Sequence, residues 1–263
     1  MPYFPQLTSG AVAQFPSSKQ VLRRTVVNEA ADGSTVKLAD PAANGVEWSL
    51  KFAGLTDAEW NAIETLFEAV EGQLDSFTFL DPFDNLASWS EDPTQAAWIK
   101  GSGLAVTLGL ADPLGGTGAA SVVNQGSSGA NIQQSINAPG GYQYCMSVWA
   151  QSAAAALITL FQNTATKSAS QGFTIGPVWT RLEYGANLGA PEDAVNFGVT
   201  VEGGSAVELF GFQVEAQVGA SKYRKTTEGN GVYASAWFLD DTLTRTTNGL
   251  EDNSCTLRIR ASG

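Results

Sequence analysis

The stretch Val195-Asn196-Phe197-Gly198-Val199-Thr200-Val201 decides the fold, because every second residue in it is large and apolar. Side chains of a β-strand point alternately to the two faces of a sheet, so this pattern predicts a strand with one buried and one wet face. Similar alternation recurs in residues 104–110, 142–148 and, more loosely, 207–214, with turn residues between the runs. Many short strands at this spacing predict a β-sandwich or jelly roll.

The N-terminal part of the chain combines one helix with several strands. Thr56-Asp57-Ala58-Glu59 has the spacing of a capping box, in which the Thr56 side chain accepts from the Glu59 amide and the Glu59 side chain reaches back. This motif predicts a helix over about 56–71, which ends at Gly72 in a left-handed conformation. Strands are expected at residues 24–27 and 34–38, which form a hairpin around Asp32-Gly33, and at residues 46–52 and 74–80.

The composition of the chain changes after Pro82, where Ser, Ala, Gly, Asn and Gln become frequent and charged residues become sparse. Aromatic and charged residues return near the C-terminus, where strands are expected at 232–238 and 255–260. These changes predict a discontinuous outer domain of residues 1–82 plus 226–263, and a sandwich of residues 83–225 inserted into it. A surface loop tolerates such an insertion when the ends of the inserted domain lie close together. The predicted fold class is therefore mainly β, with one α-helix.

The overall composition excludes several classes of function. The 263 residues include no histidine, which rules out Ser-His-Asp triads, Cys-His pairs and His-ligated zinc. The net charge of -12 disfavours binding to nucleic acids and anionic lipids. Cys145 and Cys255 lie far apart in strand-like runs, which favours buried free thiols over a disulfide. Residues 1–13 lack a signal-peptide pattern and the apolar run 153–161 is too short to span a bilayer, so we expect neither secretion nor membrane insertion.

Neighbouring acidic residues offer carboxylates, but in an arrangement that does not suit catalysis. Glycoside hydrolysis needs two carboxyl groups ~5–9.5 Å apart around one bond, whereas adjacent residues of a strand point to opposite faces. Most of the acidic pairs also lie beside Pro or Asn, where acids serve turns. They are Glu91/Asp92, Glu192/Asp193, Asp240/Asp241 and Glu251/Asp252. We therefore expect no catalytic residues and no enzyme activity, and a polysaccharide-degrading enzyme is the least favoured alternative.

Two tryptophans are candidates for ligand binding. Trp149 shares a strand face with polar residues, and Trp179 is expected to share a face with Arg181. An indole exposed on a sheet can pack against the apolar C–H face of a sugar ring. The alternative, which we favour, is that Trp149 and Trp179 cover a sheet edge or face another part of the protein.

A structural calcium ion is a further candidate ligand. Jelly-roll modules often hold Ca²⁺ through carboxylate and carbonyl oxygens. Asp84, Asn85 and Glu215 supply such oxygens near the two ends of the inserted module, which are expected to lie close together. The alternative is that these side chains cap turns. No other cofactor is expected.

Short motifs in the outer domain resemble those of phage minor tail proteins of the distal tail hub type. They are Tyr3–Leu7, Leu55–Trp60 followed by Glu71-Gly72, Phe77–Pro82 and Ala236–Asp241. The middle of the chain resembles the carbohydrate-binding-like jelly rolls that are common in phage tail proteins. That resemblance lies in Asp84–Leu86, Trp89–Glu91, Trp98–Lys100 and Phe210–Glu215.

These resemblances imply a structural component of a phage tail tip, located in the virion after assembly in the bacterial cytoplasm. The outer domain would join the tail tube to the tip by forming an oligomeric ring with other copies of itself and with tail tube and tip proteins. DNA would pass an acidic channel without specific binding. The inserted jelly roll would point outward, where it would meet cell-surface glycan. In the alternative interpretation, the protein is a receptor-binding or carbohydrate-binding tail protein that acts through this inserted module.

Overall fold

The computed structural model describes residues 1–262, which divide into two compact units. The helix-bearing unit contains residues 1–8, 12–79 and those from Tyr233 onward, and the sandwich unit contains residues 9–11 and 80–232. The second junction therefore falls later than the composition had suggested. The reason is that residues 226–232 stay bonded to the start of the sandwich unit: Trp89 N–H donates to Thr227 O and Gly231 N–H to Asn85 O.

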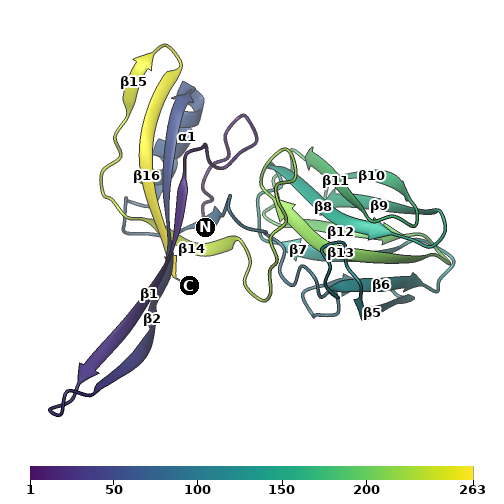
Figure 1. Ribbon diagram of the computed structural model, residues 1–263. Helices are drawn as coiled ribbons and strands as arrows, with labels where there is room; N and C mark the ends of the chain where they lie inside the picture. The colour runs from purple at the N-terminus through teal and green to yellow at the C-terminus, as the bar shows by residue number, and fades with distance from the viewer. Residues whose placement is uncertain (263) are drawn as a thin grey trace. The chain divides into compact units, whose positions relative to one another are not determined.

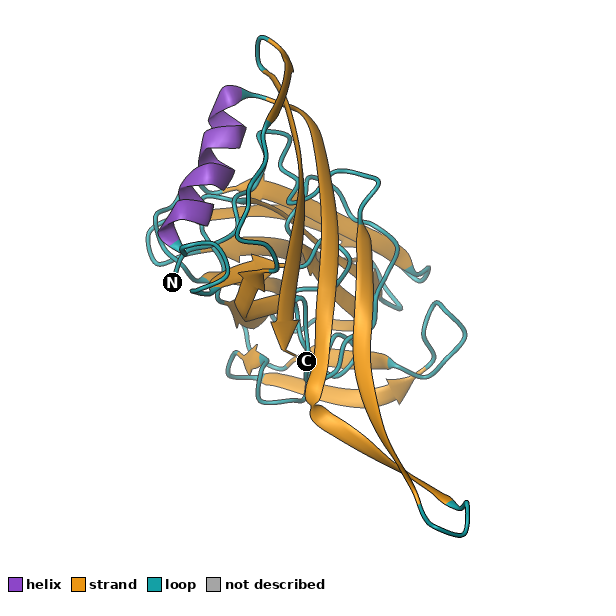
Figure 2. Ribbon diagram, turned by 90° about the vertical axis from the view of Figure 1, so that its left-hand side faces the viewer, coloured by secondary structure: helices purple, strands orange, loops and turns teal. Residues whose placement is uncertain are grey.

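The helix-bearing unit is built on a six-stranded sheet in which β1–β2, β2–β16, β14–β16 and β15–β16 are antiparallel pairs. Its strands follow the order β1-β2-β16-β14-β3, and β15 pairs with β16. Their bounds are β1 Ser18–Glu29, β2 Thr35–Leu55, β3 Phe77–Leu80, β14 Val232–Phe238, β15 Thr246–Gly249 and β16 Asp252–Ser262. The helix α1, Asp57–Ala69, packs against β2 and β16 (Figure 2).

The capping box predicted at the start of α1 is confirmed. The Thr56 side chain accepts from the Glu59 N–H, and the Glu59 carboxylate accepts from the Thr56 N–H. The helix buries Trp60, Ile63 and Leu66 against the sheet. Beyond its end, both Glu71 (φ 50°) and Gly72 (φ 65°) adopt the left-handed conformation, which stops the helix as expected.

Two strand predictions in this unit need correction. The strand expected over 74–80 begins only at Phe77, because the chain is still turning after the helix, where Leu74 donates to Glu71 O and is exposed. The runs 34–38 and 46–52 belong to one strand, β2. Its pairing with β1 is interrupted between Leu22↔Gly45 and Arg24↔Asp40. The unpaired residues 41–44 of β2 form an irregularity there, which accommodates Pro41.

The sandwich unit consists of two five-stranded sheets, which confirms the predicted β-sandwich (Figure 1). One sheet has the order β10-β9-β12-β7-β4, and the other has the order β11-β8-β13-β6-β5. The first contains β4 Ile99–Lys100, β7 Ala130–Ile136, β9 Ala156–Asn163, β10 Ser168–Ile175 and β12 Val195–Val201. The second contains β5 Leu104–Leu110, β6 Ala119–Asn124, β8 Gln143–Gln151, β11 Thr180–Asn187 and β13 Ala206–Glu215.

The core of the sandwich is formed by the inward-facing residues of both sheets. Phe197 and Val199 of β12 belong to the same buried cluster as Tyr144 and Met146 of β8. The alternation read in residues 195–201 and 142–148 thus predicts the correct buried face. Within residues 1–262, no helix combines the length and the apolar character needed to cross a membrane.

Both cysteines are buried free thiols, as predicted. Burial raises the pKa of Cys145 to about 12, with a smaller contribution from the nearby carboxylates of Glu183 and Glu215. Burial alone raises the pKa of Cys255 to about 11. Since the thiolate is the reactive form, both side chains behave as small apolar residues near neutral pH.

Candidate functional site

The outward surface of the sheet β10-β9-β12-β7-β4 is the most distinctive polar surface of the sandwich unit. The register places residues of β7, β12 and β9 in rows across this surface, with side chains that are amides, hydroxyls, one glycine and one phenylalanine. We call this surface the neutral face. Its rows are Asn131–Thr200–Thr159, Gln133–Gly198–Phe161 and Ser135–Asn196–Asn163.

The neutral face lacks charge because its strands lack charged residues. Strands β7, β9, β10 and β12 contain no Asp, Glu, Lys or Arg. Lys100 of β4 is the exception in this sheet, and its ammonium group donates to the carbonyl groups of Pro93, Thr94 and Trp98. These four strands therefore offer no side chain for an ion pair with a ligand.

The polar side chains of the neutral face hold one another in place. Thr200 Oγ1 donates to Asn131 Oδ1 over 2.8 Å, and Asn196 Nδ2 donates to Asn163 Oδ1 over 2.9 Å. Each amide keeps further donor or acceptor capacity, since an amide group can form up to four hydrogen bonds. The face therefore presents donors and acceptors that are already oriented.

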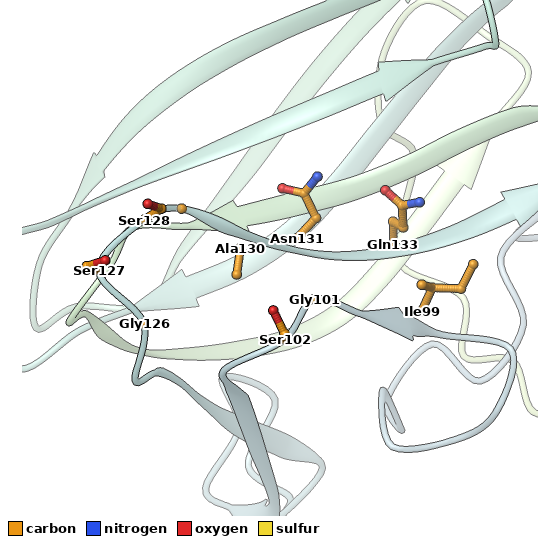
Figure 3. A pocket seen from close by; sticks show the side chains of 10 residues that line it. Ile99, Gly101, Ser102, Gly126, Ser127, Ser128, Ala130, Asn131 and Gln133 are labelled. Carbon is orange, nitrogen blue, oxygen red and sulfur yellow. The ribbon is translucent and has the colours of Figure 1, made fainter.

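A groove of about 470 Å³ runs along the β7–β4 edge of the neutral face (Figure 3). Asn131 and Gln133 project from the same side of β7, while Ile99 and Ser102 contribute from the neighbouring segment. The remaining lining is Gly101 and residues 126–130. Because much of this lining is Gly, Ser and Ala, the groove exposes backbone polar groups as well as side chains.

Phe161 supplies an aromatic ring on this face, which also carries the exposed aliphatic side chains of Leu157 and Ile99. Phe161 is only 6% exposed, although its position opposite Gly198 in the strand pairing directs its side chain away from the core. Gly198 explains this burial, because a Cβ atom at Gly198 would lie 2.7 Å from Phe161 Cζ and 2.5 Å from the Ile132 carbonyl oxygen. The end of the Phe161 ring therefore lies over the glycine.

The tryptophans named from the sequence lie on the other sheet. Trp149 and Arg181 are cross-strand neighbours in β8 and β11, with the guanidinium carbon 4.6 Å from the indole centroid. The segment of residues 216–225, which we call the covering segment, folds over them. Its Tyr223 ring meets the indole edge-on at 5.3 Å, and its Ser221 carbonyl accepts from Arg181 over 2.6 Å. Trp179 precedes β11 instead of lying in it, so only Trp149 and Arg181 are brought together.

The three residues proposed as calcium ligands are engaged in hydrogen bonds that stabilise the fold. Asn85 is fully buried and bonds to four backbone groups, and Glu215 accepts from Gln213, the Ser221 amide and Arg224. The Asp84 carboxylate accepts from the Asn85 N–H. Because Asn85 Oδ1 already accepts from two backbone amides and the two carboxylates also accept N–H groups, these residues do not fit a calcium site. Among residues 1–262, no group of three or more Cys, Asp or Glu side chains is placed to hold a metal ion.

The neutral face was not predicted from the sequence. The available signal was the lack of charge in residues 130–136, 156–163, 168–175 and 195–201. That signal gains meaning only when the four segments are known to be neighbours in one sheet.

Comparison with known proteins gives distant structural similarity to β-sandwich domains. A xylan-binding domain of CBM 22 has a TM-score of 0.43 and 15% identity, covering 53% of this chain and 99% of that one. The CBM22-1 xylan-binding domain of Paenibacillus barcinonensis Xyn10C has a TM-score of 0.42 and 16% identity, covering 54% and 99%. The enzymatically active domain of bacteriophage CBA120 tailspike protein 4 has a TM-score of 0.41 and 15% identity, covering 52% of this chain and 22% of that one. No family model and no curated protein matches the sequence.

Proposed function

We propose that the sandwich unit is a binding module for neutral polysaccharide, and that the neutral face is its binding surface. The observation that carries this proposal is the uncharged, amide- and hydroxyl-bearing surface on an otherwise acidic chain. Sugar hydroxyls both donate and accept hydrogen bonds, and so do amide side chains. A ligand without charge gains nothing from ion pairs, so an uncharged surface suits it.

The shape of the surface also supports an extended ligand. The groove of about 470 Å³ lies within the size range of ordinary ligand sites, roughly 300–1,000 Å³, and it continues onto the open neutral face. Gln133 belongs both to the groove and to the row of Phe161. A chain of sugar units can therefore contact the groove and the rows of the sheet at once.

Removing two amides from the face tests this proposal. The double variant Asn131→Ala/Gln133→Ala is expected to weaken polysaccharide binding by about 5- to 150-fold, because each of the two lost hydrogen bonds contributes about 0.5–1.5 kcal/mol. Binding is measured by retardation in native gels that contain xylan, β-glucan or galactan. Asn187→Ala, which removes an exposed amide from β11 on the other sheet, is the control and should bind like the wild type. Failure of the wild-type protein to bind any neutral polysaccharide would contradict the proposal.

A second candidate function, assembly with other copies, is favoured by the hairpin arm of residues 24–40. In this arm β1 is the edge strand, and β2 pairs with β16 only from Gly45 onward, so both outer edges of the arm are unpaired. Val27, Val36 and Leu38 are each more than half exposed. Two-stranded ribbons are only marginally stable alone, and exposed edges and apolar residues promote association. Ring formation in a phage tail tip is the specific form of this assembly that the sequence resemblance predicts.

Charge placed on the hairpin arm should prevent such assembly. Val36 and Leu38 lie on the same face of β2, two residues apart, so Val36→Lys/Leu38→Lys introduces two charges into one apolar patch. We expect the wild type to form oligomers and the variant to stay monomeric in native mass spectrometry. Lys substitution of the exposed Val178 in the sandwich unit is the control and should leave the oligomers intact. A wild-type protein that is monomeric at every concentration would argue against assembly through the arm.

A further inference from the structure

A second cavity of the sandwich unit lies beside the edge strand β5 and shares no lining residue with the groove of the neutral face. We call it the side cavity. Its volume is about 270 Å³. It is lined by Trp89, Glu91, Asp92, Leu108, Thr117, Gly118 and residues 225–227. Its lining therefore combines an indole, an aliphatic side chain and a pair of opposite charges.

The backbone of Trp89 is held in a conformation that bulky residues rarely adopt. Its φ angle is +52°, in the left-handed region. Three hydrogen bonds hold it there: its N–H donates to Thr227 O over 2.7 Å, and its carbonyl accepts from Asp92 N–H and from Trp98 Nε1. Strain of this kind persists only where the surroundings impose it, and it is common at binding sites. Trp89 lines the cavity, and its half-buried side chain also packs against the core of the sandwich unit.

Glu91 and Lys225 place an acceptor and a donor side by side in the same wall. Lys225 Nζ lies 2.5 Å from Glu91 Oε2, and the Tyr223 hydroxyl donates to Glu91 Oε1 over 3.1 Å. The Glu91 side chain is 16% exposed and the Lys225 side chain is 61% exposed, so the lysine is the more accessible of the two. Gly118 allows this arrangement, because a Cβ atom there would lie 2.9 Å from Glu91 Oε2. Glu91 and Lys225 neutralise each other, so this pair offers an acceptor and a donor without adding net charge to the site.

Asp92 adds a negative charge to the lining, but its carboxylate is engaged in hydrogen bonds within its own turn. Its carboxylate accepts from Gln95 and from the amide and hydroxyl of Thr94. Burial alone would raise its pKa, but these hydrogen bonds outweigh burial and lower the pKa below its ordinary value. Asp92 is thus ionised near neutral pH, and its carboxylate bonds to Thr94 and Gln95 of the same turn.

From this geometry we infer that the side cavity binds a single neutral pyranose unit, as a second and independent carbohydrate site. The apolar C–H face of the sugar packs on the Trp89 indole. Two neighbouring hydroxyls of the sugar match the donor of Lys225 and the acceptor of Glu91. The volume lies just below the range of roughly 300–1,000 Å³ for drug-sized ligands, so the cavity accommodates one ring and not an oligosaccharide.

Titration of the full chain with simple glycosides tests this inference. The probes are the methyl glycosides of glucose, galactose, mannose and xylose, and tetrahydropyran is the matched ring without hydroxyls. Binding is followed through the indole N–H signals in NMR spectra. We expect at least one glycoside to bind in the millimolar range and tetrahydropyran to bind at least tenfold more weakly. Trp89→Gly should weaken glycoside binding at least tenfold, and glycine also relieves the left-handed strain.

Further variants separate the side cavity from the neutral face and from a loss of folding. Lys225→Met keeps the length of an exposed side chain but removes the donor, and it should weaken binding severalfold even if Trp89→Gly proves unstable. Lys222→Met, outside the cavity, should have no effect. Asn131→Ala/Gln133→Ala should leave glycoside binding unchanged whether or not the neutral face binds polysaccharide. The inference is overturned if no glycoside binds the wild type, if Lys225→Met binds normally, or if the amide double variant abolishes binding.

Discussion

Replacing Asn85 by alanine is expected to lower the free energy of unfolding of the sandwich unit by about 3–5 kcal/mol. Asn85 Nδ2 donates to the carbonyl groups of Phe212 and Arg224, and Asn85 Oδ1 accepts from the amides of Ala87 and Val214. The side chain is 0% exposed, so water cannot easily replace it. Each buried polar group left without a partner costs about 1–3 kcal/mol, and partial relaxation limits the sum.

The effect of Asn85→Ala is measured by denaturant-dependent hydrogen exchange of amides in β8 and β13, which reports on the sandwich unit separately. Asn187→Ala removes an exposed amide whose Nδ2 donates to Gly141 O, and it should change stability by no more than about 0.5 kcal/mol. If Asn85→Ala costs less than about 1 kcal/mol, the four hydrogen bonds do not organise this unit as we describe.

Gly198→Ala should have the second large effect, because it alters both the stability of the sandwich and the neutral face. The added Cβ atom would lie 2.5 Å from the Ile132 carbonyl oxygen and 2.7 Å from both Gln133 Cβ and Phe161 Cζ. The first of these contacts is with backbone of the paired strand, so β7 and β12 must shift apart. Overpacking of this kind typically costs about 1–3 kcal/mol.

The same substitution should also weaken polysaccharide binding in the native-gel assay, since it displaces Gln133 and lifts the Phe161 ring. Gly176→Ala is the matched control, because a Cβ atom there meets nothing within 4 Å. Stability is read from thermal unfolding and binding from gels with xylan, β-glucan or galactan. Normal stability together with normal binding for Gly198→Ala would show that the close approach at Gly198 is not required.

Only part of the candidate site was accessible from the sequence. The parity of residues 143–149 correctly placed Trp149 on the side of its strand away from the core, where it pairs with Arg181. The sequence could not show that residues 216–225 fold back over this side. An exposed platform and a covered aromatic cluster have the same local pattern, so only the path of the chain distinguishes them.

Strands with few large apolar residues also escaped prediction. In β7 the inward positions are Ile132, Gln134 and Ile136, and the buried amide of Gln134 interrupts the apolar alternation. Its Oε1 atom accepts from Ser88 N–H and its Nε2 atom donates to Ser88 O, which makes burial possible. This partner lies 46 residues away along the chain, beyond the reach of local reasoning.

The sequence by itself determined the features that depend on neighbouring residues. They include the mainly β character, the capping box at Thr56 and Glu59, and the buried face of residues 195–201. Tertiary structure alone decided which strands became neighbours: β12 lies between β9 and β7, both of which precede it in the chain. The neutral face and the side cavity depend on such long-range pairings. Periodicity tells which side of a strand is buried, whereas it carries no information about the strand or segment that will lie beside it.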